Sequence, residues 1–345
     1  MYTTSQNNDF TAIHSDFKWN GKSSTKQELL SIAESYVNSD KDYKIQIGFF
    51  LNDWFNDNSN IEVQTSGSTG VPKKMWVKKQ YMINSALATQ DFFDLPAGTT
   101  ALLCLPATYI AGKLMLVRAL ILGWDIYSVK PQANPLKGDK TYDFCAMTPY
   151  QMEKSFENLE RIQKIMVGGG AVSSTLLKKI QSVSSEIYET YAMTETLTHI
   201  AARRINGLEA FKKPPFRLLK NVEVKQDKNG CLIIKAPKVT DEIIHTNDIV
   251  KLTSSTEFYL KGRIDNVINS GGIKIHPEEV EQSLSLLIEE RFFIAGLPDE
   301  TLGEAVILVI EKHLSQEKKN NLHQNIRDLK NLSRYERPKT ACLKE

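Results

Sequence analysis

The chain has 345 residues, of which 41% are hydrophobic and 24% are charged, and its formal net charge is +2. A chain of this length can bury a large core and is expected to form about two domains. Because the charges are nearly balanced and form no Lys/Arg block, we expect neither a nucleic-acid partner nor a membrane-surface partner. The sequence also lacks the run of roughly 18 apolar residues that a membrane-spanning helix needs.

The cysteines and the N-terminus indicate the compartment. The four cysteines are widely scattered, with no C-x-x-C spacing for a metal and no disulfide framework. Residues 1–9 are polar and lack the apolar segment of a signal peptide. Both observations predict a cytoplasmic protein. The oligomeric state is left open, with a homodimer as one option.

Helices and strands alternate over the first two thirds of the chain, after an irregular start at residues 1–20. Apolar spacing predicts helices at Lys26–Val37, Ile45–Phe55, Lys79–Phe93, Ala111–Leu122, Tyr150–Leu159 and Ser173–Val183. Short apolar or β-branched runs predict strands at Ile61–Val63, Thr99–Leu105, Asp125–Val129, Phe144–Met147, Lys164–Val167 and Glu186–Thr190. This alternation implies right-handed βαβ units and a doubly wound, mostly parallel sheet.

From about Phe216 the sequence becomes rich in strands. Asn229-Gly230 predicts a hairpin between Val222–Lys225 and Leu232–Lys235. A second hairpin is expected at 249–260. The helices Pro277–Leu287 and Gln316–Leu329 and the strands Arg291–Ala295 and Ala305–Ile310 complete a small unit. The predicted fold class is α/β: a large domain of residues 1–262, with parallel sheets plus a β-rich section, and a small mobile α+β domain of residues 263–345.

One stretch, residues 63–74, has the chemistry of a phosphate-binding loop. A short strand leads into two glycines, Gly67 and Gly70, which let the backbone turn its N–H groups toward an anion. Hydroxyl donors come from Thr65, Ser66, Ser68 and Thr69, and a mobile charge comes from Lys73. The spacing differs from the G-x-x-x-x-G-K-[ST] loop. A flexible Gly/Ser linker is the alternative interpretation.

Two glycine- or hydroxyl-containing loops follow predicted strands. Gly168-Gly169-Gly170-Ala171 has a bare backbone that a ligand could approach closely, although a tight turn is an equally good interpretation. Tyr191–Thr196 places an aromatic ring, a hydroxyl and the Glu195 carboxylate on one loop. These groups suit a base and a Mg²⁺-bound triphosphate, although an ordinary loop is the more frequent meaning of so short a motif.

Two further stretches lie near the expected domain boundary. Asp248 precedes a strand, where it could bind ribose hydroxyls or simply cap a turn. Residues 262–281 are punctuated by glycine, and the pair Arg263 and Asp265 could be a surface ion pair. A glycine-rich, charged segment between domains also suits a hinge that moves a lid.

Taken together, these stretches resemble the adenylate-forming superfamily, which includes acyl-CoA synthetases, adenylation domains of peptide synthetases and luciferases. The matching segments are Thr65–Lys73 for T-S-G-S-T-G-x-P-K, Tyr191–Thr196 for Y-G-M-T-E-T, Thr246–Asp248 for T-G-D, and Gly262–Glu281 for the G-R-x-D hinge motif. The four motifs occur in the family's order. The resemblance implies an ATP-dependent enzyme that releases pyrophosphate, forms an acyl-adenylate and passes the acyl group to a thiol such as CoA.

The resemblance also implies a role for each matching residue. Lys73 and Thr194 are implied in catalysis, Glu195 in catalysis and in holding Mg²⁺, and Asp265 as the hinge pivot. The residues implied to bind ATP come from the loops and motifs above, and they are Thr65, Ser66, Gly67, Ser68, Thr69, Gly70, Gly169, Gly170, Ala171, Tyr191, Asp248 and Arg263. In-line attack on the α-phosphorus depends mainly on positioning and charge neutralisation.

The sequence departs from the family pattern in three places. Ala192 and Asn247 replace glycines, and Asn tolerates left-handed geometry better than most residues. The third departure concerns the lysine that assists adenylation in a G-K element of the small domain. Lys344 comes too early to be that lysine, so we expect either a chain cut short or impaired adenylation with surviving thiol transfer.

The phosphate loop begins about a hundred residues earlier than in most of the superfamily, so part of the N-terminal subdomain is expected to be missing. Such compact forms resemble the o-succinylbenzoate–CoA ligases of menaquinone biosynthesis. Leu105–Leu120 is similar to their L-P-L-[YF]-H-[IV]-S-G…R-x-L segment, with Tyr109 in place of the histidine. The resemblance implies that Lys113 and Arg118 neutralise the succinyl carboxylate of a dicarboxylic acid, whereas solvated charges on a helix are the plain alternative.

Two other activities remain open. The first is an aryl-acid adenylation enzyme that loads a carrier protein. The second is a nucleotide-binding protein without catalysis, which the missing lysine would explain.

Overall fold

The structure is a computed structural model that describes residues 11–64, 74–209, 213–285, 287–288, 290–311, 315–338 and 340–343. The chain forms two compact units. Unit 1 comprises Met1–Val172, Ile180–Glu223 and Lys235–Ile243, and unit 2 comprises Ser173–Lys179, Val224–Ile234 and Ile244–Glu345. The division at 262/263 expected from the sequence stays a prediction.

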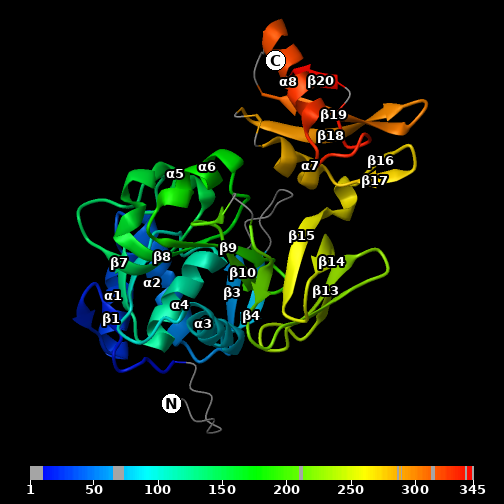
Figure 1. Ribbon diagram of the computed structural model, residues 1–345. Coiled ribbons are helices and arrows are strands. Elements are labelled where there is room, and N and C mark those ends of the chain that lie inside the picture. Colours follow the sequence, from blue (N-terminus) through cyan, green and yellow to red (C-terminus); the bar gives the residue numbers. More distant parts are fainter. Residues whose placement is uncertain are drawn as a thin grey trace. The chain divides into compact units, whose positions relative to one another are not determined.

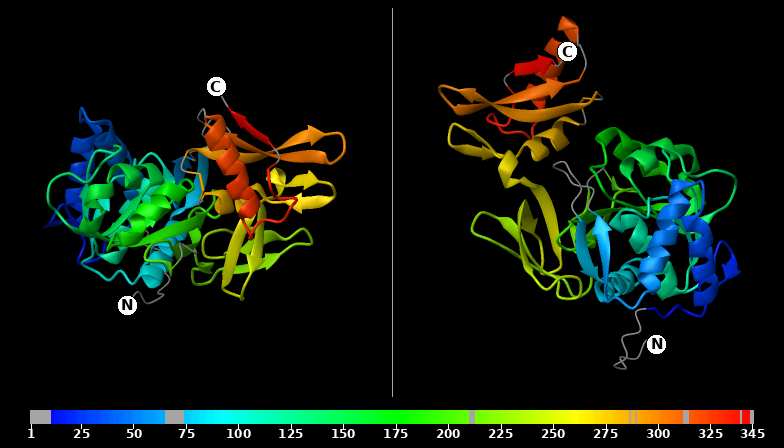
Figure 2. Two further views of the ribbon diagram at one scale, coloured as in Figure 1. Left: turned by 45° about the horizontal axis from the view of Figure 1, so that its top comes forward. Right: turned by 180° about the vertical axis from the view of Figure 1, so that it is seen from behind.

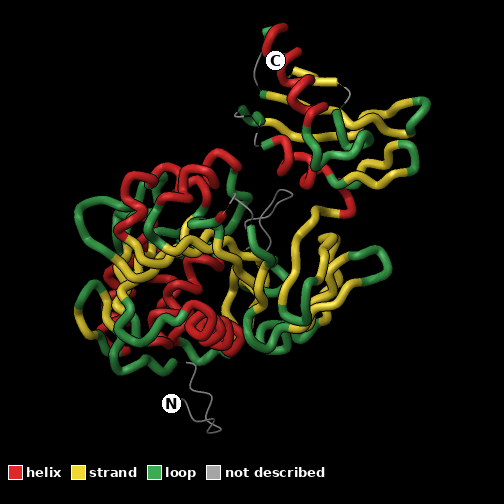
Figure 3. Tube along the Cα trace, viewed as in Figure 1, coloured by secondary structure: helices red, strands yellow, loops and turns green. Residues whose placement is uncertain are grey.

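A mostly parallel sheet with helices on both faces forms the core of unit 1 (Figures 1 and 3). Its order is β11-β10-β9-β8-β7-β5-β6-β1-β2. The strands are β1 Lys18–Trp19, β2 Lys22–Ser23, β5 Thr100–Leu103, β6 Asp125–Ser128, β7 Tyr142–Met147, β8 Ile162–Val167, β9 Glu186–Ala192, β10 His199–Arg204 and β11 Phe216–Leu218. The run from β1 through β6, β5, β7 and β8 to β9 is parallel, while β2, β10 and β11 are antiparallel to their neighbours. The predicted α/β sheet is confirmed.

The helices of unit 1 follow the apolar spacing of the sequence. They are α1 Lys26–Val37, α2 Asp42–Phe55, α3 Lys79–Phe93, α4 Ile110–Leu122 and α5 Pro149–Lys154, with 3-10 turns η1 Phe156–Arg161 and η2 Ile180–Ser182. A capping box at Thr25 and Glu28 begins α1. In Figure 2, α1 and α2 pack side by side. Helix α4 is apolar around nearly its whole circumference and is buried from Gly112 to Leu122, so it forms the centre of the core.

The start of α4 depends on a residue without a side chain. A Cβ at Gly112 would overlap the backbone carbonyl of Pro106, which cannot move aside as a flexible side chain could. We therefore expect Gly112→Ala to lower the free energy of unfolding by about 1–3 kcal/mol, the cost typical of overpacking a core. Urea unfolding measures this change. The neighbouring exposed Ala111→Ser should alter stability by less than about 0.5 kcal/mol, and equal stabilities of the two variants would contradict the prediction.

A second, smaller sheet of unit 1 holds the ends of the predicted phosphate loop. Strands β3 Asn60–Gln64 and β4 Lys74–Lys78 pair antiparallel. Their register places Gln64 opposite Lys74, so the chain leaves β3 and enters β4 at adjacent positions. Strand β4 was not predicted from the sequence.

Unit 2 contains two antiparallel groups of strands. The first runs in the order β12-β13-β14-β15, with β12 Glu223–Gln226, β13 Cys231–Lys235, β14 Ile243–Leu252 and β15 Glu257–Arg263. The second runs β17-β16-β19-β18, with β16 Ile268–Ser270, β17 Ile273–Ile275, β18 Phe292–Asp299 and β19 Gly303–Ile310; β20 Thr340–Leu343 lies parallel to β19. The predicted hairpin at Asn229-Gly230 is confirmed, with Gly230 at a φ of +82°.

Helices complete unit 2. They are α6 Ser174–Lys179, α7 Pro277–Leu284 and α8 Gln316–Asp328, with the 3-10 turn η4 at Ile264–Asn266. Val280, Leu284, Leu308 and Ile326 from α7, β19 and α8 share one apolar cluster. This packing confirms the predicted α+β character of the C-terminal part. Within the described ranges, no helix has the length and apolar character needed to cross a membrane.

Candidate active site

The predicted phosphate loop lies mostly outside the described residues. Thr65, Ser66, Gly67, Ser68, Thr69, Gly70 and Lys73 lie outside the described residues. Its flanks are described: Lys74 forms an ion pair of 2.9 Å with Glu62 across the β3–β4 pair. The roles expected for these seven residues stay predictions.

The glycine loop lies at the carboxyl end of β8. Gly168 packs against Thr190 so closely that a Cβ would sit 2.8 Å from the threonine hydroxyl, and this hydroxyl donates to the Val167 carbonyl at 3.1 Å. Gly169 has a φ of +80°, which favours glycine, and Gly169, Gly170 and Ala171 are exposed. The loop therefore presents open backbone at the sheet edge, as a ligand floor requires.

The Tyr191–Thr196 loop lies at the same edge, because β8 and β9 are adjacent and parallel. Thr194 and Glu195 are exposed at its tip. The buried Thr196 hydroxyl holds the turn by donating to the carbonyls of Met193 (3.1 Å) and Thr198 (2.9 Å). The structure thus brings the glycine loop and the Tyr191–Thr196 loop together, with their polar groups free to face a ligand.

Tyr191 is buried within a set of aromatic and charged side chains that the sequence did not reveal. The ring centroids of Tyr191 and Phe216 are 6.0 Å apart. The guanidinium carbon of Arg203 lies 4.0 Å from the centroid of the Phe216 ring. Glu189 pairs with Arg203 at 2.7 Å and with Lys213 at 3.2 Å. Burial opposes ionisation of Glu189, but the two cations outweigh it and lower the pKa of this carboxyl. The network fixes the position of the Tyr191 ring.

The exposed carboxylate of Glu195 is suited to coordinate a magnesium ion. Its carboxylate has no hydrogen-bond or ion-pair partner among the described residues. Mg²⁺ is commonly held by one or two carboxylates together with substrate phosphates, so a cage of protein ligands is not needed. No group of three or more metal-binding side chains occurs in the part of the chain that the structure describes.

The residues expected to bind ribose and to form the hinge lie together in unit 2. Asp248 on β14 is the cross-strand neighbour of Arg263 on β15, at 3.9 Å between the charged groups. Arg263 also pairs with Asp265 at 3.0 Å, and Asn247 donates to both oxygens of Asp265 at 3.0–3.2 Å. The hydrogen bonds from Arg263 and Asn247 lower the pKa of Asp265. Asn247, which replaces a glycine of the family motif, thus has a side-chain contact with the predicted hinge residue.

Lys113 and Arg118 are both buried on α4 and are not solvated surface charges. Lys113 Nζ donates to the Glu62 carbonyl at 2.9 Å, which ties α4 to β3. Arg118 is 1% exposed; its Nε donates to Thr89 Oγ1 at 3.2 Å and its Nη1 lies 3.7 Å from Met115 Sδ. Burial lowers the pKa of Arg118 to about 9. No acidic side chain pairs with Arg118 among the residues that the structure describes.

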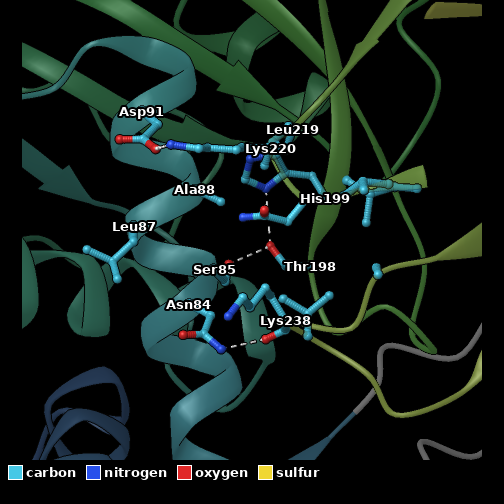
Figure 4. Close-up of a pocket in the computed structure, with 15 residues that line it drawn as sticks. Asn84, Ser85, Leu87, Ala88, Asp91, Thr198, His199, Leu219, Lys220 and Lys238 are labelled. Carbon is cyan, nitrogen blue, oxygen red and sulfur yellow. Dashed lines mark hydrogen bonds and ion pairs between the residues drawn. The ribbon is translucent and has the colours of Figure 1, made fainter. Parts of the chain in front are cut away.

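A cavity of about 220 Å³ lies in unit 1 between α3, β10 and the segments around residues 219–222 and 236–239 (Figure 4). Ser85, Thr198 and His199 supply its buried polar wall. Ser85 Oγ donates to Thr198 Oγ1 at 3.1 Å, and Thr198 Oγ1 lies 3.2 Å from His199 Nδ1. His199 Nε2 is buried without a hydrogen-bond partner. Sequence reasoning missed this histidine, because its only signal was one polar ring in the apolar run Ile200-Ala201-Ala202.

His199 should make stability depend on pH. Burial, and secondly the Arg118 charge, lower its pKa to about 3 from the 6.5 of an ordinary histidine. Between these two pKa values His199 is protonated in the unfolded chain and neutral in the folded protein. The free energy of unfolding therefore falls as the pH drops from 6.5 toward 3. Between pH 6.5 and pH 5, urea unfolding should show that the wild type loses about 1.5 kcal/mol more than His199→Leu does. Identical losses would show that His199 is protonated in the folded state.

Known proteins were compared with this chain. The family model described as AMP-binding enzyme matches residues 63–233. An acyl-CoA synthetase (AMP-forming)/AMP-acid ligase II-like protein from Dyadobacter fermentans is 32% identical, with 91% of this chain and 92% of that chain covered and a TM-score of 0.64. A 2-succinylbenzoate–CoA ligase from Geobacillus is 25% identical over 75% of this chain. The o-succinylbenzoate CoA synthetase of Bacillus subtilis, solved with its acyl-adenylate, shares the fold at a TM-score of 0.64 and 20% identity, over 82% of this chain and 64% of that chain.

The chain belongs to the family of AMP-binding enzymes, since it aligns with nearly the full length of the Dyadobacter relative at 32% identity. It spans 59% of the length of the Geobacillus ligase. The resemblance inferred from the four sequence motifs is therefore confirmed at the level of the family and of the fold.

Proposed function

We propose that the protein is an acid–thiol ligase that joins a carboxylic acid to ATP as an acyl-adenylate and then transfers the acyl group to CoA. The proposed acid is o-succinylbenzoate, the proposed cofactors are ATP and Mg²⁺, and the proposed location is the cytoplasm. Several ligases of 2-succinylbenzoate are similar to this chain, among them those of Geobacillus and of Lactococcus lactis. A solved Bacillus subtilis relative contains ATP and a magnesium ion.

The sheet edge in unit 1 supports the ATP half of this proposal. Gly169 and Gly170 offer bare backbone, and Thr194 and Glu195 offer an exposed hydroxyl and carboxylate, on loops that follow two adjacent parallel strands. Ligands of open α/β sheets bind outside the carboxyl ends of the strands. When bound there, Mg²⁺ would neutralise phosphate charge, with Glu195 as its ligand from this chain.

The observation that supports a dicarboxylic acid as the substrate is the buried side chain of Arg118. A guanidinium that is 1% exposed and has no acidic partner within the described ranges requires an anion to offset its desolvation. A dicarboxylic substrate supplies one: the carboxylate that is not adenylated would pair with Arg118, and such charge-assisted pairs are strong and directional. Lys113 is a second proposed contact, although its described partner is the Glu62 carbonyl.

A panel of carboxylic acids with ATP, Mg²⁺ and CoA tests the proposed function. We expect pyrophosphate release that depends on both CoA and 2-succinylbenzoate, and formation of the thioester. Rapid turnover of another aryl acid, with none of 2-succinylbenzoate, would contradict the proposed substrate. Preferential transfer to the phosphopantetheine of a carrier protein would identify the alternative adenylation enzyme, and ATP binding without any acyl-adenylate would identify a non-catalytic nucleotide-binding protein.

A further inference from the structure

The cavity in unit 1 contains a hydrogen-bonding group that the ATP site does not use. His199 is 4% exposed and lines the cavity, and its Nε2 atom has no partner. Buried polar atoms are nearly always hydrogen-bonded, and leaving one unpaired costs about 1–3 kcal/mol. An unpaired ring nitrogen at the wall of a cavity therefore indicates a ligand that completes its hydrogen bonding.

The neighbouring hydroxyls are compatible with a ring that carries its proton at Nε2, and this is the tautomer that we assign. Ser85 Oγ donates to Thr198 Oγ1, and Thr198 Oγ1 lies 3.2 Å from His199 Nδ1, where either atom can be the donor according to the tautomer of the ring (Figure 4). A neutral ring that accepts at Nδ1 carries its proton at Nε2. The nearby Arg118 charge further disfavours the doubly protonated ring. In this assigned tautomer His199 offers one neutral N–H donor, which calls for an acceptor oxygen on the ligand.

The rest of the cavity defines the chemical class of this ligand. Apolar side chains form most of the remaining wall, among them Leu219, Val222 and Val239. Asp91, Lys220 and Lys238 line the cavity and are exposed, and Lys220 pairs with Asp91 at 3.6 Å, so Lys238 is the remaining lysine of the lining. A volume of about 220 Å³ admits only a small molecule. An apolar body with a carboxylate matches apolar walls, Lys238 and the N–H donor assigned to His199.

One wall of the cavity lies on the strand next to the segment that leads to Thr194 and Glu195. His199 faces Ala192 across the β9–β10 pair, and Ala192 belongs to the loop that carries Thr194 and Glu195. The turn between them is held by Thr196, whose hydroxyl bonds the carbonyl of Thr198 at 2.9 Å. A ligand bound against His199 is therefore close in the fold to the loop expected to contact phosphate.

We propose that His199 is a specificity-determining residue of the acid site, donating Nε2–H to the substrate carboxylate that is not adenylated. The proposal rests on the proposed function and adds to it a second recognition group, distinct from Arg118. Ser85 and Thr198 act as positioning residues, since they reach the substrate only through the ring.

The test compares 2-succinylbenzoate with two analogues that each lack one carboxylate, 2-butyrylbenzoate and 3-benzoylpropionate. The analogue that still forms an acyl-adenylate retains the reacting carboxylate and lacks the recognised one. In the wild type we expect kcat/KM to be higher for the diacid than for this analogue. His199→Leu should lower kcat/KM for the diacid about 10–100-fold, mainly through KM, and leave the analogue nearly unchanged, because only the diacid loses a hydrogen bond.

Three further measurements separate recognition from folding. His199→Gln, which restores an N–H donor, should recover part of the preference for the diacid. His323→Leu, on α8 of unit 2, is the matched control and should leave kcat/KM unchanged for both the diacid and the analogue. Titration of ¹⁵N-histidine-labelled protein with 2-succinylbenzoate should shift the His199 Nε2 resonance while the ring stays neutral.

The outcomes distinguish the two proposals. If 2-succinylbenzoate binds and shifts His199 but no thioester forms, the proposed activity is wrong and the role of His199 stands. If the thioester forms and His199→Leu retains the full preference for the diacid, the role of His199 is overturned. An unchanged His199 resonance in the presence of saturating, bound 2-succinylbenzoate would overturn it as well.

Discussion

Replacing Glu195 by Gln should reduce the single-turnover rate of acyl-adenylate formation by about 10²–10³-fold, the scale of losing one charge contact in a transition state. The substitution keeps the shape of the side chain and removes its charge. Because Glu195 is exposed at the tip of the Tyr191–Thr196 loop and has no described partner to lose, the fold should be unaffected. Quenched-flow measurement of pyrophosphate release at saturating Mg²⁺ and ATP gives the rate.

The matched control is Glu160→Gln, an exposed glutamate of the η1 turn. Both variants should unfold within about 0.5 kcal/mol of the wild type, as surface substitutions usually do. A higher Mg²⁺ concentration should rescue Glu195→Gln in part if the lost carboxylate was a metal ligand. Normal single-turnover adenylation by Glu195→Gln would contradict the assignment of this residue.

Arg118→Met should separate stability from acid recognition. Replacing a buried charge by an apolar side chain of similar length removes a desolvation cost that no acidic residue offsets in the described part of the chain. We therefore expect the free energy of unfolding to be unchanged or to rise by about 1–3 kcal/mol. The same change should raise the KM for the acid about 10²-fold, since a substrate carboxylate would lose its buried partner.

Urea unfolding and acid-dependent pyrophosphate exchange measure the two effects on one protein sample. Arg161→Met is the control, because this arginine is partly exposed and only 3.5 Å from the exposed Asp139. Its KM for the acid should stay at the wild-type value. A destabilised Arg118→Met protein with an unchanged KM would show that Arg118 is a structural residue and that the acid binds elsewhere.

The sequence predicted those parts of the fold that local spacing controls. The periodic helices Lys26–Val37 and Lys79–Phe93 occur as predicted, and the parallel sheet follows from their alternation with short apolar strands. The four motifs indicated the family correctly and placed the glycine loop and the Tyr191–Thr196 loop at one edge. Both results rest on short-range signals, which survive without any knowledge of tertiary contacts.

The environments of single polar side chains could not be predicted in the same way. Arg118 and Lys113 have spacing that suits either a solvated face or a core, and only the complete burial of α4 decides between them. The cavity depends on α3, β10 and segments near residues 220 and 238, which are far apart in sequence. Strands β4 and β10 were missed because their pairing partners, and not their own composition, stabilise them.

The contacts between α4 and β3 bear on how the two proposed substrates, ATP and the acid, would influence each other's binding. Lys113 Nζ donates to the Glu62 carbonyl, and Tyr109, directly before α4, forms a β-bridge with Gln64, which precedes the predicted phosphate-binding residues Thr65–Lys73. Helix α4, which carries Arg118, is thus hydrogen-bonded to β3, the strand that leads into the predicted phosphate loop. Thermodynamic coupling is reciprocal, so any factor by which an acid changes ATP affinity is the factor by which ATP changes acid affinity. Two binding isotherms for ATP, one with and one without the acid, therefore give the coupling factor for both ligands.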